Sequence, residues 1–186
     1  EHAVRLAPRH SKAHEAKSSV HFLLKQKDEF AEEAEIVLSL NPNDPDTLAL
    51  LGNRFWASQV DRERGVALTR QAIALLPNTH PPWFLYVIFW DHYTNGRYEE
   101  ALATALKIDL EDYFWTHYTR AIAYVRLGRM LDAEASVARL NDLIPGFSIE
   151  VAEAIVRKYS DDEAVTAQTM DALRLAGVPE TPPPPP

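Results

Sequence analysis

The chain has 186 residues, of which 46% are hydrophobic and 25% are charged, as in ordinary folded proteins. Its 19 Lys and Arg against 27 Asp and Glu give a formal net charge of -8, which argues against a nucleic-acid surface. The absence of cysteine excludes disulfides, thiolate metal sites and cysteine nucleophiles. No apolar stretch is long enough to span a bilayer and the start has no signal-peptide pattern, so we expect a cytoplasmic segment without membrane contact.

A proline recurs along the chain at a nearly constant spacing. Pro8, Pro42, Pro77 and Pro145 each stand two residues after a leucine, and the intervals between them are 34, 35 and 68 residues, the last being two periods. Helix-forming sequence lies between them, and a period near 34 is typical of tetratricopeptide repeats, in which each repeat is a helix–turn–helix. We therefore predict an all-α tetratricopeptide-repeat right-handed superhelix of about four helical hairpins with C-terminal capping helices.

The expected elements follow in chain order. The first helix should begin after Ser11 as N-cap, because serine accepts a hydrogen bond from the first helical turn. The predicted helices cover about 11–24, 28–40, a pair within 46–76, 83–93, 97–109, a pair within 114–145, 149–158 and 162–175. As domains, we expect the tail of a preceding repeat helix at 1–10, the repeat array at 11–145, capping helices at 146–180 and a polyproline tail at 181–186.

Aromatic residues concentrate on the first helices of successive repeats, which in a tetratricopeptide stack line a concave groove. An apolar groove of this kind would bind a protein or peptide partner, with tryptophans as anchors. The alternative is that the same side chains pack in the core between helices. The predicted groove residues are Trp56, Trp83, Tyr86, Trp90, Tyr93, Trp115 and Tyr118, with Arg126 as an anion partner at the groove edge.

Other candidate chemistry is weak. His10 and His14 are an i, i+4 pair at an expected helix start, and no His-Glu-x-x-His motif occurs, so we expect no metal. The acidic residues Asp109, Glu111 and Asp112 lie where a helix begins, and the helix dipole accounts for negative charge there. No nucleophile elbow and no phosphate-binding glycine loop is present, so we expect neither catalytic residues nor a cofactor.

Several ordered strings resemble a more specific group than a generic repeat. They are Leu40–Asp44, Leu48–Gly52, Arg64–Leu68, Pro77–Trp83, Asp91–Tyr93, Gly96–Ala103, Phe114–His117 and Ala172–Glu180. Together they are similar to the C-terminal tetratricopeptide-repeat region of bacterial class III adenylate/guanylate cyclase-like signalling proteins, over about residues 31–180. In that group a cyclase or DNA-binding domain precedes the repeats. The first repeat departs from the pattern, because His14, Lys17 and Ser18 stand where an aromatic residue, a leucine and a glycine are expected.

The resemblance and the repeats together predict a non-catalytic protein–protein interaction or regulatory domain of a bacterial signalling protein. Two alternatives from other classes remain. One is a self-association module, a homo-oligomer that dimerises an upstream catalytic domain. The other is a small-molecule sensor whose aromatic groove closes over an apolar ligand. The sequence does not identify the partner or the upstream domain.

Overall fold

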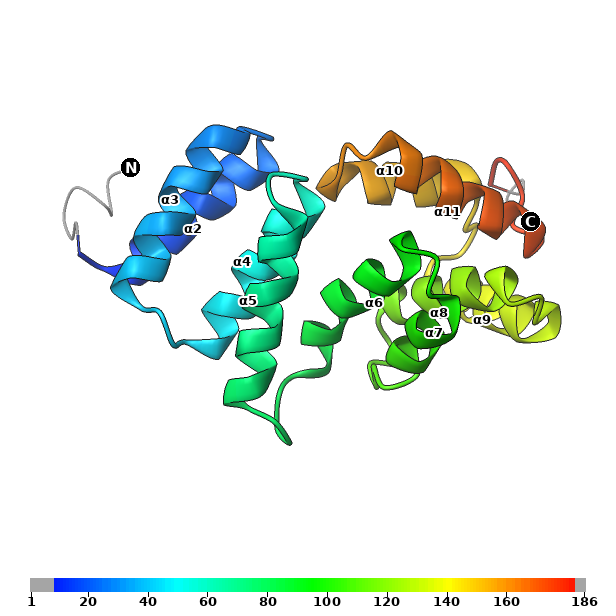
Figure 1. The fold of residues 1–186 in the computed structure, drawn as a ribbon. Helices are drawn as coiled ribbons and strands as arrows, with labels where there is room; N and C mark the ends of the chain where they lie inside the picture. The colour runs from blue at the N-terminus through cyan, green and yellow to red at the C-terminus, as the bar shows by residue number, and fades with distance from the viewer. Residues whose placement is uncertain (1–8, 183–186) are drawn as a thin grey trace. The chain divides into compact units, whose positions relative to one another are not determined.

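The computed structural model describes residues 9–182, and within that range it consists of ten α-helices and one 3₁₀-helix, with no strand (Figure 1). The all-α prediction is therefore confirmed. The expected helix tail at residues 1–10 and the polyproline tail lie largely outside the described residues. The chain divides into two compact units, Glu1–Val87 and Ile88–Pro186, which we describe one at a time.

Unit 1 consists of two helical hairpins followed by a single 3₁₀ turn. Its elements are α2 Ser11–Leu23, α3 Lys27–Leu40, α4 Pro45–Ala57, α5 Arg62–Leu75 and η1 Pro82–Phe84. The tight turns of the two hairpins are equivalent, because Lys25 and Gln59, which lie 34 residues apart, both have positive φ values, 59° and 62°. The prediction that Ser11 is the N-cap of the first helix is wrong. His10 holds that position without a side-chain hydrogen bond, and Ser11 is the first helical residue.

Helices α4 and α5 approach each other closely at two glycines. A Cβ atom on Gly65 would stand 2.6 Å from the Gly52 carbonyl oxygen and 2.9 Å from the Trp56 amide nitrogen. A Cβ on Gly52 would stand 2.7 Å from the Gly65 carbonyl oxygen. All three distances are to backbone atoms, which cannot move aside without shifting a helix. Glycine at positions 52 and 65 therefore permits the close spacing of this hairpin.

Unit 2 contains most of α6, which runs from Leu85 to Thr94, and five further helices. They are α7 Tyr98–Ala105, α8 Phe114–Arg126, α9 Met130–Leu143, α10 Ile149–Tyr159 and α11 Glu163–Leu175. Gly96 and Gly128 form the turns of its first two hairpins with φ values of 73° and 70°, which glycine adopts without strain. Helix α7 ends four residues before the predicted position, and residues 106–113 form turns instead.

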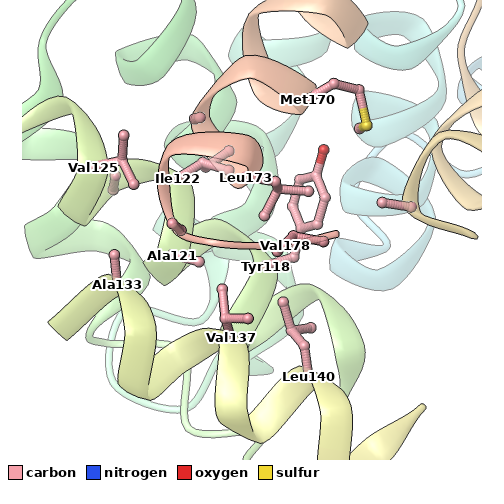
Figure 2. Close-up of a cluster of buried hydrophobic side chains, with 14 of the residues drawn as sticks. Tyr118, Ala121, Ile122, Val125, Ala133, Val137, Leu140, Met170, Leu173 and Val178 are labelled. Carbon is pink, nitrogen blue, oxygen red and sulfur yellow. The ribbon is translucent and has the colours of Figure 1, made fainter. Parts of the chain in front are cut away.

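The C-terminal helices α10 and α11 complete the core of unit 2. Helix α11 packs directly on α8, and Figure 2 shows Tyr118 and Ile122 of α8 beside Met170 and Leu173 of α11. The segment that follows α11 is held at the start of α10, where the Ile149 amide donates to the Pro179 carbonyl oxygen over 2.9 Å. Among the described residues, no helix is both long and apolar enough to cross a membrane.

Candidate interaction surfaces

Three of the predicted groove residues share one face of α8. Trp115, Tyr118 and Arg126 lie three and eight residues apart, which places them on one stripe of a helix. The Trp115 ring lies 6.2 Å from the Tyr159 ring of α10, and the Arg126 Nη2 donates to the Gln168 carbonyl oxygen of α11 over 2.7 Å. The chain's own C-terminal hairpin therefore covers this stripe.

Two residues of α6 join the same stripe. The Trp90 ring lies 6.3 Å from the Tyr118 ring, and the Arg126 Nε donates to the Tyr93 hydroxyl over 3.2 Å. Tyr93 and Tyr118 are completely buried, and burial raises the pKa of both phenols. The structure thus brings five predicted residues together, with Tyr93 and Tyr118 in the core, which is the alternative that the sequence left open.

The other three predicted residues belong to unit 1. Trp56 is buried beneath the Arg62 guanidinium, which lies 4.7 Å from its ring, a cation–π contact. Trp83 is half-buried and meets the Phe84 ring edge-on at 4.6 Å, and Tyr86 is buried. Of these three, only Trp83 keeps substantial exposed ring surface.

An aromatic surface cluster lies at the outer end of the α8 stripe, and we define it as Tyr113, Trp115 and Tyr159. Tyr113 is 47% exposed, Tyr159 is 39% exposed and Trp115 is half-buried. Partial burial and the neighbouring Tyr159 both raise the pKa of Tyr113, in that order. The sequence analysis found only Trp115, because Tyr113 and Tyr159 are 46 residues apart and come together only where the end of α10 reaches Trp115.

The acidic residues before α8 border this cluster, and one of them has a structural role. Glu111 receives a hydrogen bond of 2.8 Å from Arg120 and, through its carbonyl oxygen, one of 2.7 Å from His117. These contacts tie the turn before α8 to the helix itself. Asp109 and Asp112 are exposed in the same turn, so negative charge stands beside Tyr113.

A second apolar surface lies at the C-terminal end of α2 in unit 1, and we call it the α2 edge. It consists of Val20, Leu23 and Leu24, which are 53%, 52% and 62% exposed. Three large aliphatic side chains within five residues, each more than half exposed, are unusual on a helix that otherwise packs against α3. This surface could not be predicted from the sequence, because its 3- and 4-residue spacing is also that of a buried face.

A buried ionic cluster joins α2 to α3. His14 Nδ1 donates to a Glu33 carboxylate oxygen over 2.7 Å, and the Lys17 ammonium donates to the other oxygen. His14 and Glu33 are 5% and 7% exposed. Burial raises the pKa of Glu33, but hydrogen bonds from Lys17 and His14 outweigh it, so the pKa lies below its usual value. No group of three potential ligands among the described residues could hold a metal ion.

Comparisons with known proteins bear on the fold alone. No family model and no curated protein matches the chain. Among solved structures, a crystal structure of MamA protein superposes with a TM-score of 0.60 at 15% identity, covering 89% of each chain. YrrB, described as a TPR protein with an unusual peptide-binding site, superposes with a TM-score of 0.58 at 10% identity, covering 94% of this chain and 88% of its own. The fold is that of a tetratricopeptide-repeat protein.

A double mutant of MamA from RS-1 gives the same result, with a TM-score of 0.61, 17% identity and coverage of 90% of this chain and 94% of that one. The tetratricopeptide hairpins predicted from the proline spacing are thus confirmed. All of these identities are too low for a ligand or a partner to be transferred with the fold.

Proposed function

We propose that this chain is a non-catalytic protein-interaction module that binds its partner through the aromatic surface cluster. The observation that carries the proposal is that Tyr159 lies against Trp115 and also interacts with Tyr113, at the surface of a tetratricopeptide-type unit. Tyrosine and tryptophan dominate the energetics of protein interfaces, because they bury a large area at little cost in side-chain entropy. Both tyrosines keep more than a third of their surface exposed, which leaves area to bury on binding.

The charges around the cluster indicate the chemistry of the partner. Asp109 and Asp112 place negative charge beside Tyr113, in a chain whose net charge is -8. The Lys158 ammonium already lies 5.6 Å from the centre of the Tyr159 ring, so a cation is accommodated on this aromatic surface. We therefore expect a segment that carries arginine or lysine, whose cation would stack on a ring while the aspartates attract it from solution.

Site-specific photo-crosslinking tests this function. p-Benzoylphenylalanine is placed at position 159, and in a control chain at position 131, where Leu131 is 82% exposed on α9. In an extract of the source cells, irradiation should give a defined protein adduct from position 159 and none from position 131. Unlabelled wild-type chain should suppress the adduct, whereas a Tyr113→Ala chain should compete poorly. No adduct at position 159, or equal adducts at both positions, would refute the proposal.

Only some of the predicted groove residues are exposed enough to contact a partner. Of its eight residues, Trp83, Trp90, Trp115 and Arg126 are half-buried and have surface left for a partner, whereas Tyr93 and Tyr118 do not. Trp90→Ala distinguishes the two roles of a half-buried ring. If Trp90 contacts a partner, the variant should bind more weakly and keep its helicity. An equal loss of folding and binding would mark Trp90 as core.

The wider context stays a proposal drawn from the sequence resemblance. In it, this chain is the regulatory C-terminal part of a bacterial cyclase-like protein in the cytoplasm, and the comparisons lend this no support. The coding sequence upstream of Glu1 tests it, because a cyclase domain there is required. Light scattering tests the self-association alternative, which a concentration-independent monomer would remove. Saturable binding of an apolar small molecule at Trp90 and Trp115 would favour the sensor alternative.

A further inference from the structure

The two hairpins of unit 1 are copies of one repeat, so equivalent positions can be compared directly. The positive-φ residues Lys25 and Gln59 set the register at 34 residues. By this register Ala13, Lys17, Val20 and Leu24 of α2 correspond to Thr47, Leu51, Arg54 and Ser58 of α4. Where a residue of α4 is buried and the equivalent residue of α2 is exposed, the difference shows which surface of α2 lacks a neighbouring helix.

The face of α4 is covered by the first hairpin. Thr47 and Leu51 are completely buried, and Leu51 lies in one apolar cluster with Phe30, Ala34 and Val37 of α3. The Thr47 hydroxyl donates to Glu15 of α2 over 2.8 Å. The guanidinium of Arg54 lies 5.8 Å from the centre of the Phe22 ring. This face of the repeat therefore packs against the preceding hairpin.

The equivalent face of α2 has no such cover among the described residues. Val20 and Leu24, at the positions of Arg54 and Ser58, are 53% and 62% exposed, and Leu23 beside them is 52% exposed. Ser58, by comparison, is 8% exposed. The α2 edge thus continues an established hairpin–hairpin interface, with aliphatic residues where α4 has polar ones. Burying large aliphatic side chains is favourable, at roughly 25 cal/mol for each Å².

The helix that covers α4 shows which chemistry suits the α2 edge. Helix α3 presents Phe30, Ala34 and Val37 to α4, and five of its fourteen residues are acidic. Two cations border the α2 edge, since Lys25 and Lys27 are exposed immediately after Leu24 and ahead of the acidic Asp28 and Glu29 of α3. A second copy of this chain is disfavoured as occupant. Its α3 surface is already covered by its own α4, and two α2 edges would bring basic borders together.

We infer that the α2 edge is a docking surface for an acidic amphipathic helix, which stacks on α2 as α3 stacks on α4. The aliphatic face of that helix covers Val20, Leu23 and Leu24, and its carboxylates face Lys25 and Lys27. The occupant belongs to a helical hairpin of the same kind as α2–α3. This surface lies in unit 1, so it is independent of the aromatic surface cluster in unit 2.

A peptide with the sequence of residues 27–41 is the probe for this surface, because it is an acidic amphipathic helix of the required type. Acetylated, amidated and fluorescently labelled, it is titrated with the full 186-residue chain and followed by anisotropy. We expect saturable binding that Val20→Glu with Leu24→Glu weakens roughly tenfold or more, equivalent to about 1.4 kcal/mol. Leu131→Glu, at a still more exposed aliphatic position on α9, should bind the peptide like the wild type.

Two further measurements keep the test decisive. A scrambled peptide of the same composition should not bind, which separates docking from charge attraction. Lys27→Glu changes only a border charge and should weaken binding by a smaller factor, even if the double variant proves unstable by circular dichroism. Absence of saturable binding to the wild type, or equal affinity of the wild type, the double variant and Lys27→Glu, would overturn the inference. Neither result would affect the crosslinking at position 159.

Discussion

The two hairpins of unit 1 have the same repeat architecture but different interiors. In α4–α5 the helices meet at Gly52 and Gly65, so closely that neither glycine has room for a methyl group. In α2–α3 the position of Gly52 is taken by the buried Ser18, and the helices are joined by the ionic cluster of His14, Lys17 and Glu33. The contact between the two helices is a close backbone approach in α4–α5 and an ionic interaction in α2–α3.

The two hairpins thus share a backbone arrangement, although the side chains that join their two helices differ in chemistry. Close packing of two helices is insensitive to pH, because no group in it titrates. A buried ion pair contributes only while its carboxylate is ionised and while both partners are present. The two hairpins should therefore respond differently to substitution and to acid, and three predictions use that difference.

The largest effect is expected for Gly65→Ala in α5. The new methyl group would contact backbone atoms of Gly52 and Trp56 within 3 Å, so the helices must separate and the hairpin should lose about 3 kcal/mol. Gly96→Ala is the control, because Gly96 has open space around it and a φ of 73°, which costs a side chain roughly 1 kcal/mol. Amide hydrogen exchange measures both variants, in α4 and α5 for Gly65→Ala and in α6 and α7 for Gly96→Ala. An equal loss of stability in the two variants would contradict the claim that α4 and α5 pack closely at Gly52 and Gly65.

A smaller effect is expected for Glu33→Ala in α3. The substitution leaves the Lys17 ammonium and the His14 imidazole without their carboxylate, and hydrogen exchange in α2 and α3 should show a loss of about 2 kcal/mol. Glu35→Ala is the matched control on the same helix, because its pair with Arg64 is exposed and should contribute less than about 1 kcal/mol. If Glu33→Ala costs no more than the control, the ionic cluster is not what joins α2 to α3.

The smallest effect is a dependence on pH that is specific to the first hairpin. Because the folded-state pKa of Glu33 is lowered, its contribution to the free energy of unfolding is complete above about pH 4.5 and declines as the pH falls through the folded pKa. Between about pH 5 and pH 3, α2 and α3 should thus lose protection faster than α5. Glu33→Gln should reduce that difference in hydrogen exchange, and an unchanged difference would assign it to other carboxylates.

Much of the fold could be predicted from the sequence, because proline spacing and helical periodicity are local signals. Helices α10 and α11 were expected at 149–158 and 162–175 and lie within one residue of those bounds. The alignment of Trp115, Tyr118 and Arg126 on one face also followed from helical geometry. That α11 would cover this face could not be predicted, because the same pattern of buried residues suits a core or a groove.

The surfaces proposed for binding were beyond prediction for the same reason. Tyr113 and Tyr159 each precede or end a helix, and nothing local indicates that they flank Trp115. Val20 and Leu24 have the spacing of core residues, and only their exposure in the folded structure separates them from Leu51 and Phe55 on the equivalent helix. Exposure depends on which helices are neighbours in space, and a periodic sequence does not specify those neighbours.

Hydroxyl-radical footprinting, read by mass spectrometry, tests most directly the claim that α11 covers the inner face of α8 and leaves only its outer end free. Tyrosine side chains have the same intrinsic reactivity, so a difference in their oxidation rates reports a difference in exposure between the inner face and the outer end of α8. Tyr113 and Tyr159 should be oxidised many times faster than Tyr93 and Tyr118, which are completely buried. If Tyr93 and Tyr118 react as fast as Tyr113 in the folded chain, the inner face is open, and both the covered stripe and the aromatic surface cluster proposed from it are wrong.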